Sequence, residues 1–238
     1  MKPKRIWELD AFRGLCVLGM VLVHLVFDLV YLYQLVDWQY PVWFSFVMDW
    51  GGVLFLLISG ICVTLGRRSV RRGLIVLVCG FLCSLVTWGM YRLNMADRGL
   101  IIYFGVLHCL GCCMLLWPLF RKLPNGVLAV VGGIMAVAGI ILRGMHFPIG
   151  MWLMPLGFQP EQFLSSDYFP LLPQLGFFLL GTVLGRTVYR KGESLLPRVN
   201  PEMPVLRFLQ LCGKHSLWIY LLHQPILSGM VWLLSMLK

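Results

Sequence analysis

The chain has 238 residues, of which 59% are hydrophobic and 13% are charged, and its mean hydropathy is +0.83. This apolar content excludes an ordinary soluble domain of the same length. The formal net charge of +10 does not by itself indicate a nucleic-acid partner, because the basic residues flank apolar segments.

Seven segments are apolar enough and long enough to cross a hydrocarbon core, which takes roughly 20 helical residues. They cover residues 11–33, 42–66, 73–92, 100–120, 125–143, 169–189 and 215–237. We therefore predict an all-α fold, a polytopic membrane helix bundle of about seven transmembrane helices that forms one domain over residues 1–238. The first segment is too long for the apolar core of a signal peptide and lacks a cleavage site, so we expect it to remain as a helix.

The distribution of basic residues predicts the orientation of these helices. If the N-terminus is cytoplasmic, only Arg92, Arg98, Arg143 and Lys238 of the 20 basic residues fall on the outer side. This asymmetry follows the positive-inside rule. The basic charge then faces anionic membrane lipids, so we expect a multi-pass protein of the cell (cytoplasmic) membrane and no nucleic-acid partner.

The first helix carries three ionisable residues, Arg13, His24 and Asp28, within "RGLCVLGMVLVHLVFDLVYLY". Each would cost on the order of 2.5–3.5 kcal/mol in the centre of a bilayer, which favours a functional reason for them. Arg13 and His24 are three helical turns apart on one stripe, about 16 Å along the axis. Asp28 follows one turn later, within reach of the His24 ring, and the stripe ends at Tyr31.

A histidine with a carboxylate behind it is the arrangement of a general base held in one tautomer. An arginine at the cytoplasmic boundary suits the phosphates of a donor, and Asp10 could pair with Arg13 at the start of the helix. Coenzyme A has the matching shape, with a phosphorylated nucleotide at one end and a thioester at the other. The structural alternative is a snorkelling Arg13 beside a polar contact between helices made by His24 and Asp28.

Other polar residues in the apolar segments are candidate partners of His24. His108 lies in the fourth segment, and His223 and Gln224 precede Pro225 in the seventh. They could line the site or serve as hydrogen-bonding groups between helices. Asp49 could cap or orient the second segment, or lie solvated at the interface.

Two segments outside the seven spans have a distinct composition. Residues 144–168 are rich in Gly, Pro, Met and Trp, which predicts a re-entrant or interfacial segment. Residues 205–213 predict an amphipathic interfacial helix. The cysteines at 108–113 ("HCLGCC") do not share one helix face with the adjacent histidine, so we expect neither a metal site nor a disulfide framework.

Several motifs resemble those of transmembrane acyltransferases. "ELDAFRGLCVLGMVLVH" has the arginine, ten residues and histidine that mark acyltransferase-three proteins, which places Arg13 and His24 on that pattern. "LDAFRG", "DWGGVLFLLISG" and "FGVLHCLG" resemble the catalytic region of heparan-α-glucosaminide N-acetyltransferases and their short bacterial relatives. "GKHSLWIYLLHQP" is similar to the last helix of those relatives. The proposed catalytic histidine of the lysosomal enzyme follows its first helix, and residues 34–41 here contain none.

The resemblance implies acyl transfer from cytoplasmic acetyl-CoA, or a related acyl-CoA, to a glycan-like or other small hydroxyl or amine acceptor. His24 and Asp28 are then the catalytic candidates, and Arg13 and Asp10 the donor-binding ones. A small proton-coupled transporter or channel with a His/Asp relay is the alternative, and a membrane scaffold is a third. Glycine pairs such as those in "VVGG" let helices pack closely, either within one chain or between two chains. The sequence therefore leaves open whether the protein is a homodimer.

Overall fold

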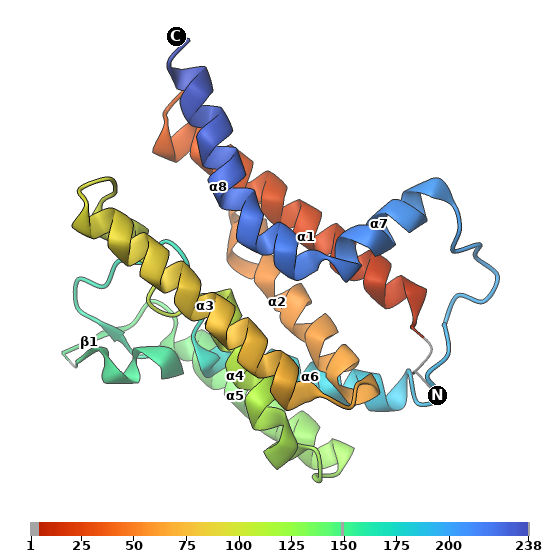
Figure 1. Cartoon of the computed structure of the whole chain (residues 1–238). Helices are drawn as coiled ribbons and strands as arrows, with labels where there is room; N and C mark the ends of the chain where they lie inside the picture. The colour runs from red at the N-terminus through yellow and green to blue at the C-terminus, as the bar shows by residue number, and fades with distance from the viewer. Residues whose placement is uncertain (1–4, 149, 238) are drawn as a thin grey trace. The chain divides into compact units, whose positions relative to one another are not determined.

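The computed structural model describes residues 5–148 and 150–237, which are mostly helical (Figure 1). Lys2, Lys4 and Lys238, which the orientation prediction used, lie outside the described residues. The chain divides into two compact units, one of Met1–Phe55 with Gly192–Lys238 and the other of Leu56–Lys191.

The first unit contains α1 (Trp7–Phe27), the short π-helix η1 (Asp28–Leu32), α7 (Pro204–Lys214) and α8 (Ser216–Ser235). It also holds the first part of α2 (Val42–Leu65), which continues into the second unit. In Figure 1, α8 lies alongside the C-terminal half of α1, and α7 packs against its N-terminal half. The first and last membrane helices of the sequence are therefore neighbours in this unit.

Two glycines set the close packing of α1 against α7. A Cβ atom on Gly14 would collide with the carbonyl oxygen of Leu209, and one on Gly213 would collide with that of Asp10. The two backbones therefore touch, as small residues permit between membrane helices. The predicted helix over residues 205–213 is present as α7, and its Val205, Phe208 and Leu211 are exposed.

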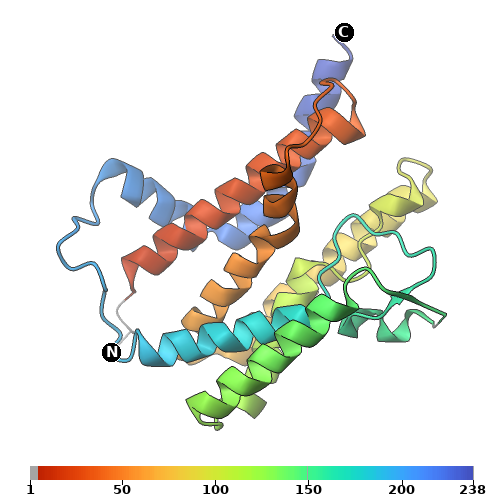
Figure 2. The same cartoon turned by 180° about the vertical axis from the view of Figure 1, so that it is seen from behind.

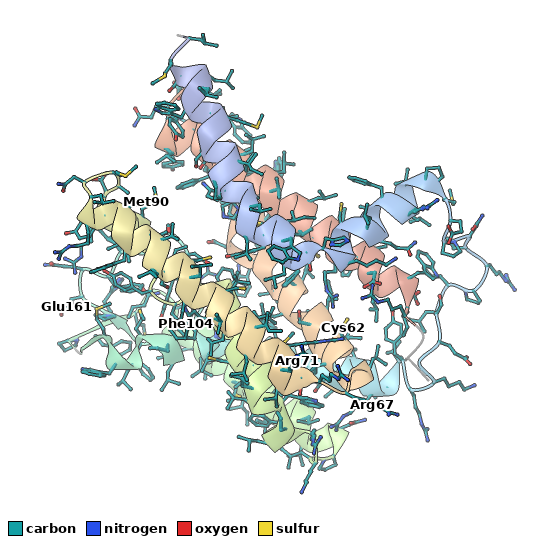
Figure 3. The ribbon with its side chains drawn as sticks, in the orientation of Figure 1. Cys62, Arg67, Arg71, Met90, Phe104 and Glu161 are labelled. Carbon is teal, nitrogen blue, oxygen red and sulfur yellow. The ribbon has the colours of Figure 1, made fainter. Side chains whose placement is uncertain are left out.

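The second unit contains the rest of α2, with α3 (Ser69–Arg92), α4 (Val106–Phe120), α5 (Asn125–Leu142) and α6 (Leu171–Thr187). α3 packs on α4, and α6 lies along α5, as Figure 2 shows from behind. Figure 3 labels Arg67 and Arg71 at one end of α3 and Met90 at the other. The basic turn between α2 and α3 thus lies a full helix length from Met90.

Residues 144–170, which we call the strap, connect α5 to α6 without a spanning helix. The strap holds the 3₁₀-helix η3 (Met151–Leu156) and two short parallel strands, β1 (His146–Phe147) and β2 (Gln159–Pro160). Another 3₁₀-helix, η2 (Arg98–Leu100), precedes α4. The hydroxyls of Ser165 and Ser166 donate to the carbonyl oxygens of Ile101 and Leu100, each at 2.9 Å. The strap is therefore fastened to the segment that leads into α4.

The predicted all-α membrane helix bundle is confirmed. Within the described residues, five helical segments are long and apolar enough to cross a membrane: Trp7–Leu32, Val42–Leu65, Ser69–Arg92, Asn125–Leu142 and Ser216–Ser235. α4 and α6 are apolar but shorter. The fourth segment was predicted to begin at residue 100, whereas α4 begins at Val106, because the preceding residues are extended and bonded to the strap.

Candidate functional site

α1 and α8 carry a cluster of polar side chains where they meet in the first unit. We call it the His–Asp cluster, and its members are His24, Asp28, His223, Gln224 and Ser228. Asp28 is 0% exposed and His223 is 8% exposed. Buried polar groups of this kind need specific partners, so their hydrogen bonds define what the cluster can do.

The two histidine rings of the cluster lie edge to face, with centroids 4.8 Å apart and planes at 73°. His24 Nδ1 lies 2.9 Å from the carbonyl oxygen of Met20, and His223 Nδ1 lies 2.6 Å from that of Tyr220. A carbonyl oxygen can only accept, so each Nδ1 carries the hydrogen in the neutral ring. Nε2 of each ring therefore carries the lone pair, which is the form that a general base requires, and in the described residues Nε2 of His223 has no hydrogen-bond partner.

Asp28 is bound by donors from α8. The amide nitrogen of Gln224 donates to Oδ1 at 2.8 Å and to Oδ2 at 3.1 Å, and the hydroxyl of Ser228 donates to Oδ2 at 3.1 Å. Because a carboxylate only accepts, the amide nitrogen of Gln224 must face it, which settles the orientation of this amide. The carboxylate thereby ties the end of α1 to α8.

The prediction that Asp28 forms a hydrogen bond with the His24 ring was wrong. Among the described residues, Asp28 pairs with Gln224 and Ser228, and the partner of His24 Nδ1 is the Met20 carbonyl oxygen. Two donors on α8 satisfy the buried carboxylate, while the histidine bonds within its own helix. The tautomer of His24 is therefore held by backbone and not by Asp28.

Tyr31 also lies away from the predicted stripe. It is 61% exposed and its ring packs on Phe27 and Tyr40, with centroids 5.6 and 5.3 Å away. The π-helical turn that starts at Asp28 has more residues per turn, so it rotates the residues that follow it off the stripe. Tyr33 reaches α8 instead, where its hydroxyl donates to the carbonyl oxygen of Ser228 at 3.1 Å.

Arg13 and Asp10 pair at the start of α1. Arg13 Nη1 lies 3.8 Å from Asp10 Oδ1, and Arg5 Nη1 lies 3.9 Å from Asp10 Oδ2. Both distances are longer than a hydrogen bond, so the guanidinium of Arg13 keeps donors for another anion. α1 is an unbroken α-helix from Trp7 to Phe27, which maintains the separation of about 16 Å between Arg13 and His24 along its axis.

His108 caps its own helix in the second unit. The backbone N–H of Gly105 donates to His108 Nδ1 at 3.2 Å, so the neutral ring carries its hydrogen on Nε2, which lies 3.4 Å from Ser84 Oγ. The ring packs edge-on against Phe81 and close over Gly80. Both ring nitrogens have protein partners, and the bond from Gly105 makes His108 a cap of α4.

Asp167 caps the same helix from the strap. Its Oδ2 accepts a hydrogen bond from the backbone N–H of Val106 at 3.1 Å, and a Cβ atom on Gly105 would collide with it. The hydroxyl of Tyr168 donates to the carbonyl oxygen of Met154 at 2.8 Å, and burial raises the pKa of Tyr168. No local sequence pattern marks Asp167 as a cap, because it lies about 60 residues along the chain from the start of α4.

Asp49 does not cap α2. The helix begins at Val42, about two turns earlier, and Asp49 lies on an exposed part of it. In residues 5–148 and 150–237, no group of three or more His, Cys, Asp or Glu side chains is arranged to hold a metal ion.

A comparison with known protein families identifies the family of this chain. The family model described as "Heparan-alpha-glucosaminide N-acetyltransferase, catalytic" matches residues 5–225, a range that includes Arg13, His24, His223 and Gln224. No curated protein and no solved structure matches the chain. The match covers most of the 238 residues and indicates a membrane enzyme of the acetyltransferase type. The chain therefore belongs to the heparan-alpha-glucosaminide N-acetyltransferase catalytic family.

Proposed function

We propose that the protein is an acyltransferase of the cell membrane that moves an acyl group, in the first place acetyl, from cytoplasmic acyl-CoA to a small glycan-like acceptor. The observation that carries this proposal is the pair of adjacent imidazoles, half-buried His24 and buried His223, whose Nδ1 atoms are both held by backbone carbonyl oxygens. Membership of an acetyltransferase family supports the reaction type.

His24 is the proposed base. Its Nε2 takes the proton of the acceptor hydroxyl or amine while the acceptor oxygen or nitrogen attacks the thioester carbonyl carbon. The carbon–sulfur bond then breaks, and the proton passes from the His24 imidazolium to the thiolate of coenzyme A. Burial of the cluster keeps bulk water, the competing nucleophile, away from the thioester.

Arg13 is the proposed contact for the phosphates of the donor. Among the described residues, its guanidinium makes a long ion pair with Asp10, and a planar guanidinium suits a phosphate better than an ammonium does. A separation of about 16 Å between Arg13 and His24 leaves room for an extended arm between phosphate and thioester. Asp10 then acts on the orientation of Arg13.

The test uses the full-length protein in detergent with acetyl-CoA as donor. Binding is measured by calorimetry, and transfer by release of coenzyme A with glucosamine or glucose as acceptor. His24→Ala should abolish transfer and leave acetyl-CoA affinity within a few fold, because the imidazole acts on the proton and not on the nucleotide. His215→Ala, an exposed histidine of the same unit, is the matched control.

Two results would count against the proposal. If the wild-type protein does not bind acetyl-CoA, acetyl-CoA is not its acyl donor. If His24→Ala keeps full turnover, His24 is not the general base. The His–Asp cluster would then be a structural contact between α1 and α8.

A further inference from the structure

One face of α7 packs on α1, and the opposite face is exposed. On the packed face, Gly213 and the carbonyl oxygen of Leu209 touch the backbone of α1. On the exposed face, the side chains of Val205, Phe208 and Leu211 are each more than half exposed. Apolar side chains gathered on an exposed helix face mark a surface that meets another molecule or a membrane.

A groove of about 550 Å³ lies on this exposed face, a size within the roughly 300–1,000 Å³ of small-molecule sites. Its lining combines the apolar Pro204, Phe208 and Leu211 with two cations, Arg207 and Lys214. The cations are two helical turns apart, about 10 Å along the axis, so they lie on the same side of the helix. Both are exposed, and among the described residues no ion pair with a carboxylate engages either of them.

The position of α7 in the chain points to a lipid ligand. α8, which is long and apolar enough to span a membrane, begins at Ser216, two residues after Lys214. The backbone of His215 between them is not helical, and Figure 1 shows α7 turning away from α8 at this joint. Lys214 therefore lies where the chain enters the bilayer, on the side that the basic residues predict to be cytoplasmic. Anionic phospholipids give that leaflet its negative charge.

We propose that the groove on α7 binds one anionic phospholipid of the cytoplasmic leaflet. The guanidinium of Arg207 and the ammonium of Lys214 bind the headgroup phosphate, and an acyl chain lies along Phe208 and Leu211. A soluble phosphate compound would match the two cations alone. A phospholipid matches both the cations and the exposed apolar side chains beside them. The inference goes beyond the proposed function, because none of these residues takes part in the transfer mechanism.

Glu202 also lines the groove and carries the opposite charge. Its backbone N–H donates to the side-chain oxygen of Asn200 at 3.0 Å, just before α7 begins at Pro204. The carboxylate of Glu202 repels an anionic headgroup. Its removal should therefore strengthen the binding that removal of the cations weakens.

The experiment measures lipid preference by native mass spectrometry of the full-length protein in detergent. Phosphatidylglycerol, which is anionic, and phosphatidylcholine, which has no net charge, are offered in equal amounts. The wild-type protein should retain phosphatidylglycerol in preference. The double variant Arg207→Gln/Lys214→Gln should lower the ratio of bound phosphatidylglycerol to phosphatidylcholine on the order of tenfold or more, because each cation near an anionic headgroup contributes roughly a fivefold gain in binding.

Two further variants separate this groove from a general effect of net charge. Lys191→Gln/Arg198→Gln removes the same charge from exposed positions in the connector before α7 and should change the ratio little. Glu202→Gln should raise the ratio by a few fold. This gain cannot come from a loss of the fold, so it tests the sign of the ligand charge directly.

Three results would overturn the inference. The first is equal retention of the two lipids by the wild-type protein. The second is a fall in the ratio for Lys191→Gln/Arg198→Gln as large as that for Arg207→Gln/Lys214→Gln. The third is displacement of phosphatidylglycerol by the same concentration of sn-glycerol 3-phosphate or acetyl-CoA, which would make the groove a site for a soluble phosphate. The preference itself is measured without acetyl-CoA and without turnover, so a failure of the proposed function would leave it unaffected.

Discussion

Asp28 and Gln224 are 196 residues apart in the sequence and share two hydrogen bonds, at 2.8 and 3.1 Å. This contact joins the end of α1 to the middle of α8, the last helix of the chain. It also brings His223, the neighbour of Gln224, against His24. The geometry of the candidate site therefore depends on a carboxylate that does not touch the proposed base.

The first prediction follows from this contact. Asp28→Asn places an amide where two donors now point, so one of them loses its acceptor, which should destabilise the protein by about 1–3 kcal/mol. The thermal midpoint of the purified protein should fall, and transfer should fall with it. Ser228→Ala removes one donor and leaves the bonds from Gln224, so its effect should be smaller. A full-strength transfer activity in Asp28→Asn would show that the joint between α1 and α8 is not needed.

The second prediction concerns Arg13. Arg13→Ala should weaken acetyl-CoA binding roughly 10- to 100-fold, because it removes a charge-assisted contact, and should change kcat less than KM. Arg13→Lys should restore binding only in part, since it lacks the planar fork. Calorimetry and steady-state kinetics measure the two effects. Normal acetyl-CoA affinity in Arg13→Ala would exclude Arg13 from the donor site.

The third prediction tests the packing of α7 on α1. Gly14→Ala should destabilise the protein by about 1–3 kcal/mol, because its Cβ would meet the carbonyl oxygen of Leu209. Gly19→Ala is the matched control on the same helix. No atom lies within 4 Å of a Cβ built there, so alanine should be neutral or stabilising by up to about 1 kcal/mol. Thermal unfolding in detergent compares the two variants. Equal effects would mean that the close approach is not maintained.

The fourth prediction concerns Asp167, which caps α4 from the strap. Asp167→Ala removes the acceptor of the Val106 N–H and should cost about 1 kcal/mol, as loss of a helix cap does. Glu161→Ala, an exposed residue of the same strap, should have little effect. Limited proteolysis should cut the strap faster in Asp167→Ala than in Glu161→Ala. Identical cleavage rates would indicate that Asp167 does not hold the strap.

The fifth prediction is the orientation in the membrane. In a variant from which the eight native cysteines have been removed, Arg68→Cys should be protected from an impermeant thiol reagent in intact cells. Glu161→Cys in the strap should react with it. The reason is the excess of basic residues on the side that holds the α2–α3 turn. The opposite labelling pattern would invert the topology, and with it the side from which the donor enters.

Much of the first helix was predictable because its signals are local. Arg13, His24 and Asp10 lie on one α-helix, where a period of 3.6 residues places side chains without reference to the rest of the fold. The pairing of Arg13 with Asp10 is observed for that reason. The prediction was wrong for Tyr31, because the π-helix at Asp28–Leu32 changes the period. No sequence pattern marked that change.

The role of His108 as a helix cap does have a local signal in the sequence. Gly105 lies three residues before it, and a side chain at that spacing can bond back to the start of its own helix. The structure shows this bond. Asp167, Ser228 and Tyr33 had no such signal. Each acts on a residue far along the chain, so its role depends on which helices and loops become neighbours.

The sequence by itself determined the class of fold and the position of its helices, because length, hydropathy and helical period are properties of each segment alone. It also places Arg13 and His24 three turns apart on the first helix. Only the tertiary structure decided that His223 meets His24 and that Asp28 binds Gln224 and Ser228. It also decided that His108 is a cap. The physical reason is that hydrogen bonds are directional and short, so a buried side chain's partner depends on which helix lies beside it.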